Sequence, residues 1–193
     1  MIRQRAARWL TEAFAPAVLV SVLLVLLGVH SEPGLARGLA LGAVAALFES
    51  VLPFLYILRG VRTGRLTDHH IGDRRQRLVP LLVAMGSVLA GFAVLLLAGA
   101  HRALVAAVVA GGVGLVVAAA VNHWWKMSVH AAVAAGSVVI LALVYGWPLL
   151  TVVPLVGAIG WSRVELKDHT WPQVVVGTAV GALVAGGVFS ALR

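Results

Sequence analysis

The sequence has no cysteine and few charged residues. The absence of cysteine from its 193 residues excludes disulfides, thiolate metal sites and a cysteine nucleophile. Only 11% of the residues are charged, whereas 61% are hydrophobic. A soluble domain is about half apolar and about a quarter charged, so this chain could not cover its apolar surface with polar groups. We therefore expect most of the chain to be surrounded by lipid.

Acidic residues are scarce as well. Seven Asp and Glu residues face fifteen Lys and Arg residues, which gives a net charge of +8. The basic residues lie in short segments between apolar runs, and no basic stripe interleaves with aromatics, so we expect no nucleic-acid partner. Anionic headgroups of the bilayer, or an anionic substrate, are the expected partners. The acidic residues are too few for a magnesium site, and we expect neither a metal nor another cofactor.

Seven apolar runs approach the length that crosses a bilayer, which is about 20 residues. No alternating β-barrel pattern appears, so helices must satisfy the backbone in lipid. We predict an all-α, polytopic membrane bundle of six to seven transmembrane helices in one domain, residues 1–193, with six if one pair is re-entrant. The first run follows three arginines and is interpreted as a retained anchor. The runs are 13–29, 35–58, 80–99, 103–121, 129–144, 149–161 and 172–192.

The basic residues are distributed unequally between the two sides of this predicted bundle. Twelve of the fifteen fall on the side of the amino terminus, and only Arg37, Arg102 and Arg193 fall on the other. The positive-inside rule then places the amino terminus in the cytoplasm. We expect a multi-pass protein of a bacterial-type cytoplasmic (inner) membrane.

Three polar segments hold most of the ionisable groups: 66–80, 123–130 and 162–173. Two predicted spans separate each segment from the next. An even number of crossings returns the chain to the same face, so we expect all three segments to lie together on the cytoplasmic side.

The third segment contains Arg163 and His169. Six residues apart, they would lie about 240° apart on a continuous helix, so they converge only if the chain bends between them. Thr170 is typical of a helix N-cap, with Pro172 in the first turn and Gln173 in the capping-box position. His169 would then lie beside a helix N-terminus, where free N–H groups favour an anion.

The other two segments add cations, a hydroxyl and imidazoles. The second offers Lys126, Ser128 and His130, and the first has arginines at 74, 75 and 77. Guanidinium groups pair bidentately with phosphate oxygens, so the arginine cluster is typical of a site for a doubly charged group.

The order of these motifs resembles the type 2 phosphatidic acid phosphatase superfamily, over about residue 66 to the carboxyl terminus. That family's pattern is Lys-x6-Arg-Pro, then Pro-Ser-Gly-His, then Ser-Arg-x5-His-x3-Asp. The matching residues of the second and third motifs are Ser128, His130, Ser162, Arg163 and His169. In the first motif His70 stands at the lysine position, seven residues before Arg77.

Besides His70, the sequence departs from the family pattern at four positions: Leu78, Met127 and Val129 replace proline, proline and glycine, and Gln173 replaces the aspartate. In the family, that aspartate orients the nucleophilic imidazole. A neutral amide can hold a tautomer but stabilises an imidazolium less well. Glu165 or Asp168 is a candidate substitute.

The resemblance implies a metal-free phosphatase acting on a lipid or polyprenyl (isoprenoid) mono- or diphosphate. His169 would attack phosphorus and form a phosphohistidine that water hydrolyses, and His130 would protonate the departing alkoxide. The groups expected to bind the phosphoryl oxygens are Arg163, Arg77, Arg74, Ser128, Lys126 and His70.

Glu49 lies near the middle of the second predicted span, four residues before Pro53. A carboxylate at that depth is expensive and marks a functional site or a buried partner. We expect it to face the bundle interior, toward His123 or an arginine, and to support the site.

Three alternative functions remain open from the sequence. One is a transporter or flippase for the same kind of lipid. Another is a catalytically weak relative that binds anionic lipid, in keeping with Gln173. The last ionises a prenyl diphosphate to make a hydrocarbon. The chemical identity of the lipid and the oligomeric state also remain open.

Overall fold

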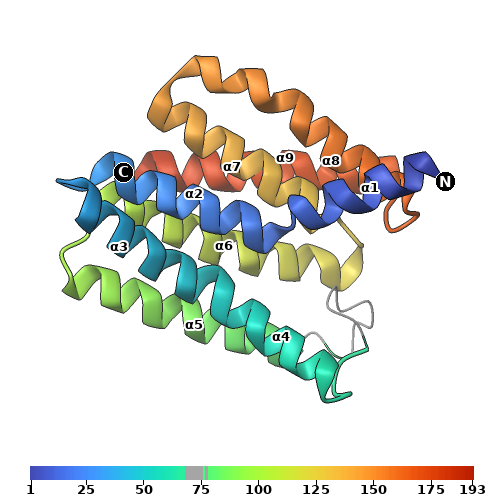
Figure 1. Cartoon of the computed structure of the whole chain (residues 1–193), viewed down its shortest axis with the longest axis horizontal. Coiled ribbons are helices and arrows are strands. Elements are labelled where there is room, and N and C mark those ends of the chain that lie inside the picture. The colour runs from blue at the N-terminus through green and yellow to red at the C-terminus, as the bar shows by residue number, and fades with distance from the viewer. Residues whose placement is uncertain (68–75, 77) are drawn as a thin grey trace.

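The computed structural model describes residues 1–67, 76 and 78–193, and the regular structure within these ranges is helical throughout (Figure 1). This confirms the predicted all-α class. In chain order the elements are α1 (Ile2–Ala13), α2 (Pro16–Ser31), α3 (Leu35–Ala46), the π-helical turn η1 (Leu47–Val51), α4 (Leu52–Arg62), α5 (Leu78–Leu97), α6 (Arg102–Trp124), α7 (Val129–Tyr145), the 3-10 turn η3 (Trp147–Val152), α8 (Val153–Glu165) and α9 (Trp171–Leu192).

Among the described residues, five helices are long and apolar enough to cross a membrane. They are Leu35–Arg62, Leu78–Leu97, Arg102–Trp124, Trp147–Glu165 and Trp171–Leu192. The helices α1 and α2, bent by 45° where they meet, would together form a sixth span. The remaining predicted run is α7, which is apolar but has only 17 residues. The chain therefore has the helices of a multi-pass membrane protein.

Several helices extend beyond their predicted limits, and for two of them the reason is clear, because their ends are polar. The first begins at Ile2 rather than near residue 13, and breaks just before Pro16, whose ring occupies the first turn of α2. The sixth continues to Glu165, beyond the predicted end at 161. Hydropathy identifies the apolar part of a helix and not its polar ends, so the predicted runs stopped before the polar end of each of these helices.

The connections between helices are gathered at two ends of the bundle. Figure 1 shows the amino terminus at the same end as the α6–α7 and α8–α9 connections, with the carboxyl terminus at the opposite end. The described part of the chain thus places the second and third polar segments on one face, as the number of crossings predicted.

Close packing of α9 on α7 fixes how far the two helices are shifted along each other. Gly177 and Gly181 of α9 lie directly against the carbonyl groups of Ser128 and Ala132 on the α7 side. A side chain at either glycine would overlap these carbonyls, and small residues commonly allow such close approach in lipid. The contact presses the first turns of α9 against the start of α7, where the polar segments lie.

Candidate functional site

The turn between α8 and α9 brings Arg163 and His169 together. After α8 ends at Glu165, Lys167 adopts a left-handed backbone with φ of 61°, which is uncommon for a residue other than glycine. The carbonyl of Arg163 accepts hydrogen bonds from the backbone N–H groups of Asp168 (3.0 Å) and His169 (3.1 Å). The predicted bend is confirmed, and the chain folds back on the end of α8.

The start of α9 holds the imidazole of His169 in one orientation. The predicted capping box between Thr170 and Gln173 is present, and Gln173 Oε1 accepts a hydrogen bond from the Thr170 backbone N–H at 3.1 Å. The same oxygen lies 3.3 Å from His169 Nδ1. Because a backbone N–H can only donate, the atom that faces Thr170 is the amide oxygen and not the nitrogen. Nδ1 of His169 therefore carries the proton, and Nε2 carries the lone pair.

The surroundings of His169 favour its neutral form. Burial lowers the pKa of His169 to about 4, and the nearby positive charges of Lys126 and Arg163 act in the same direction. The hydrogen bond to Gln173 and the charge of Asp168 oppose this shift but do not cancel it. At neutral pH the imidazole is therefore uncharged, with the lone pair of Nε2 available to an electrophile.

Arg163 is a buried cation with unused hydrogen-bond donors. The residue is only 3% exposed, and its Nη2 lies 3.0 Å from Asp168 Oδ2. Within the described residues, its buried Nε and Nη1 atoms have no hydrogen-bond partner. Buried polar atoms are nearly always paired, and a planar guanidinium matches the oxygens of phosphate or carboxylate. The open donors of Arg163 are therefore suited to an anionic ligand.

Two hydrogen bonds join the second polar segment to the third, and one more holds the second segment itself. Lys126 Nζ donates to the carbonyl oxygen of Asp168 at 2.6 Å. The Ser128 backbone N–H donates to the carbonyl of Gln173 at 3.1 Å. Asn122 Oδ1 accepts from the Met127 backbone N–H at 3.1 Å and holds the connection beyond α6. These bonds bring a second cation beside the α8–α9 turn.

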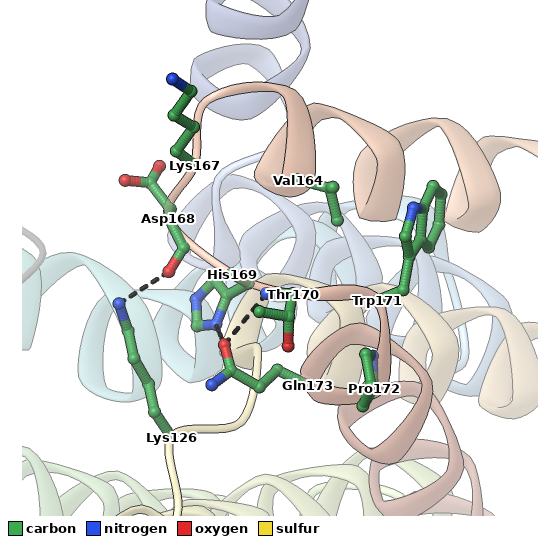
Figure 2. A pocket seen from close by; sticks show the side chains of 9 residues that line it. All are labelled: Lys126, Val164, Lys167, Asp168, His169, Thr170, Trp171, Pro172 and Gln173. Atoms are coloured by element: carbon green, nitrogen blue, oxygen red, sulfur yellow. Dashed lines mark hydrogen bonds between the residues drawn. The ribbon is translucent and has the colours of Figure 1, made fainter.

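A cavity of about 620 Å³ opens over this turn. Figure 2 shows the Lys126 side chain extending toward the Asp168 carbonyl, with the Gln173 amide between His169 and Thr170. The cavity therefore contains a neutral imidazole, a lysine and the N-terminus of a helix. Its lining residues are Lys126, Val164, Lys167, Asp168, His169, Thr170, Trp171, Pro172 and Gln173.

Other predicted site residues lie near the cavity but do not line it. Ser128 is fully buried and caps α7, its hydroxyl accepting from the Ala131 N–H at 3.4 Å. His130 lies in the first turn of α7 and is 5% exposed. Glu165 lines a separate hollow together with residues 1–4. The predicted phosphate-binding residues His70, Arg74 and Arg77 lie outside the described residues.

Glu49 faces the bundle interior, but in the described part of the chain it does not meet the partner that the sequence suggested. Its carboxyl group lies against Gly111 in the middle of α6. Gly111 precedes His123 by twelve residues, a distance of about 18 Å along a helix. Within the described residues, Glu49 forms no ion pair with an arginine, and its buried Oε2 has no hydrogen-bond partner.

Three residues that support the site were not identified from the sequence. Asn122 holds the second segment, and the hydroxyl of Thr11 lies 3.0 Å from that of Ser162, which ties α1 to α8. Asp168 was considered only as a partner for His169, whereas its carboxylate pairs with Arg163. Asn122 lies beside the second polar segment and Asp168 lies within the third, which was the only signal for them, and no sequence pattern pointed to Thr11.

Comparisons of the chain with protein-family models, with curated proteins and with solved structures gave no match. The order of the motifs and the geometry around His169 therefore carry the functional argument.

Proposed function

We propose that the protein is an integral membrane phosphatase that hydrolyses a lipid or isoprenoid mono- or diphosphate through a phosphohistidine. The observation that carries this proposal is a neutral, oriented imidazole at His169 close to the buried guanidinium of Arg163, whose Nε and Nη1 have no partner among the described residues. A nucleophile with a free lone pair suits attack on a phosphoryl group when it lies beside Lys126 and a guanidinium whose Nε and Nη1 have no partner among the described residues.

In the proposed first step, Nε2 of His169 attacks phosphorus, and the bond from phosphorus to the lipid oxygen breaks. The Nδ1 proton stays on the ring, held by Gln173. The departing alkoxide takes a proton from His130 and leaves as an alcohol. Arg163 and Lys126 stabilise the negative charge on the phosphoryl oxygens.

In the second step, water replaces His169 at phosphorus. The water gives a proton back to His130, its oxygen bonds to phosphorus, and the phosphorus–nitrogen bond breaks. Free phosphate and the starting imidazole result. The roles of His130 and of the residues in 66–80 rest on the resemblance to the phosphatase superfamily.

The substrate would enter sideways from the lipid, with its headgroup in the cavity and its tail among the apolar helices. The charge distribution supports a bacterial-type inner membrane with the cavity facing the cytoplasm. Reporter fusions at the α6–α7 and α8–α9 connections test the sidedness, and a periplasmic signal from either connection would reverse it.

The proposal is tested by phosphate release from the purified protein. The panel contains phosphatidic acid, phosphatidylglycerophosphate and polyprenyl mono- and diphosphates in detergent, with chelator present. We expect release that disappears in His169→Ala and persists in His30→Phe, a control that keeps the ring contact of His30 with Tyr145 (4.6 Å) at the opposite end. Equal release from His169→Ala and the wild type would contradict the proposal.

One observation favours a second candidate. Gln173 offers His169 an uncharged amide where the phosphatase family has a carboxylate. A weak catalyst that mainly binds phosphate headgroups would use the same cations. Saturable binding of phosphatidic acid that depends on Arg163, without phosphate release, would support this function instead.

A further inference from the structure

Glu49 lies in the π-helical turn η1, near the middle of the 28-residue span Leu35–Arg62. The turn has a local cause. Pro53 has no N–H to donate and its ring crowds the carbonyl four residues earlier, which is that of Glu49 itself. The carbonyl of Phe48 accepts a hydrogen bond from the Ser87 hydroxyl of α5. The helix is therefore widened where its one carboxyl group lies, and such π-turns often accompany function.

The side chain of Glu49 fills a space that exists only because residue 111 is glycine. The three atoms nearest to a methyl group built at Gly111 all belong to the Glu49 carboxyl group. Gly111 stands in the middle of α6, ten residues into a helix of 23. The contact thus joins two candidate membrane spans near their midpoints, far from the α8–α9 cavity.

No donor in the described part of the chain compensates a negative charge at this place. Oε2 is buried without a hydrogen-bond partner. The nearby hydroxyls are committed elsewhere: Ser50 donates to the carbonyl of Ala17 at 2.6 Å, and Ser21 donates to the same carbonyl at 2.8 Å. The hydroxyl of Ser87 donates to Phe48.

No cation among the described residues compensates it either. The turn packs against α2, α3, α4, α5 and α6. The α5 helix has no titratable side chain, and those of the other four are His30, Arg37, Tyr56, Arg59, Arg62, Arg102 and His123. Tyr56 is seven residues from Glu49, about 10 Å along the helix, and the rest lie in terminal turns. None of them forms an ion pair with Glu49 within the described residues.

We propose that Glu49 and the surrounding η1 turn form a proton-binding site at the centre of the membrane. An ionised carboxylate without a donor or a cation is very costly in this setting, so the resting protein holds Glu49 as a neutral acid. Loss of the proton would leave a buried carboxylate, which could be stabilised only by contact with water or with a cation. Deprotonation would therefore drive the carboxyl group away from Gly111 and loosen the contact between η1 and α6.

This site is independent of the proposed phosphatase activity, and a hydrophobic carbodiimide tests it directly. A protonated carboxyl group adds across N,N′-dicyclohexylcarbodiimide, and the O-acylisourea rearranges to a stable N-acylurea with no leaving group. We expect full-length protein in lipid vesicles at neutral pH to be labelled at Glu49, as located by mass spectrometry. Glu49→Gln, which keeps the size of the side chain, should remove that label. Once the acid ionises, labelling should fall about tenfold for each further pH unit.

A reagent-free measurement keeps the proposal testable if the carbodiimide cannot reach the site. The infrared spectrum should contain the carbonyl stretching band of a neutral carboxylic acid in the wild type and lose it in Glu49→Gln. Circular dichroism checks that the variant is folded. Absence of both the label and the band at neutral pH would overturn the proposal. Protection of Glu49 by sodium or potassium ions at constant ionic strength would also overturn it, in favour of a cation site.

Discussion

The amide oxygen of Gln173 lies 3.3 Å from Nδ1 of His169 and also accepts the backbone N–H of Thr170 at 3.1 Å. One side chain thus caps α9 and fixes the tautomer of the imidazole. Gln173 sets the orientation of the His169 ring without favouring its protonated form as a carboxylate would, because the amide carries no negative charge. The charge of residue 173 can be changed with little change in the shape of its side chain, by replacing the amide with a carboxylate.

Gln173→Glu should raise the pKa of His169 above its value of about 4, because a carboxylate at this distance favours the imidazolium. It should also speed the formation of phosphohistidine. The titration is measured by NMR of the histidine ring protons, and the rate by phosphate release. Gln173→Leu, which lacks the acceptor, serves as control and should slow release. A pKa unchanged by Gln173→Glu would contradict the described contact.

The stability of the protein should depend on pH through His169. Its pKa is about 4 in the folded protein, against an ordinary value of 6.5. The unfolded chain therefore binds the proton more tightly, so the contribution is complete above about pH 6.5 and is lost as the pH falls toward 4. Melting temperature in detergent should fall over this window. His169→Asn should flatten that part of the curve, and an identical slope in both proteins would refute the assignment.

Arg163→Lys should lower the rate of phosphate release by about 10²- to 10³-fold, because a lysine cannot present the planar donors of the guanidinium to phosphoryl oxygens. Arg8→Lys is the matched control, since Arg8 is exposed on α1. It should retain the wild-type rate. Similar losses in both variants would indicate a general charge effect rather than a specific role of Arg163.

Gly177→Ala should destabilise the protein by about 1–3 kcal/mol and reduce phosphate release, because the methyl group would overlap the Ser128 carbonyl. The helix α9 would shift from α7 and strain the bond from the Ser128 N–H to the Gln173 carbonyl. Gly187→Ala on the same helix meets no atom within 4 Å and should be nearly neutral. Equal melting temperatures for the two variants would argue against close α7–α9 packing.

Gly111→Ala should destabilise the wild type but have little effect in a Glu49→Ala background, because the atoms nearest the added methyl group belong to Glu49. The coupling between contacting residues is expected to be about 0.5–3 kcal/mol. Gly114→Ala, which has open space around it, is the control on the same helix. Thermal unfolding of the four combinations measures the coupling, and strict additivity would mean that the two residues do not touch.

Local chemistry explains which parts of the molecule could be predicted. The α8–α9 turn was predicted because Thr170 and Gln173 encode a capping box within four residues of sequence, and the structure has it. The expected partner of Glu49, His123 or an arginine, is not paired with it among the described residues, because the neighbours of Glu49 depend on how α3–α4 and α6 are rotated and shifted against each other. No local pattern contains that information.

Two further features depend on geometry that the sequence does not display. The polar helix α1 escaped a search for apolar runs, although its Thr11 reaches Ser162. The pairing of Asp168 with Arg163 follows from the left-handed backbone of Lys167, which is rarely expected of a lysine.

The central claim is that His169 becomes phosphorylated during turnover. Its most direct test is to mix the protein with a substrate that it hydrolyses, quench in alkali, which preserves phosphohistidine, and map the modified residue by mass spectrometry. We expect a phosphoryl group on His169, in greater yield in Gln173→Glu than in the wild type if formation is the slower step, and none in His169→Ala. Phosphate release without any phosphorylated histidine, or with the phosphoryl group on another residue, would contradict it.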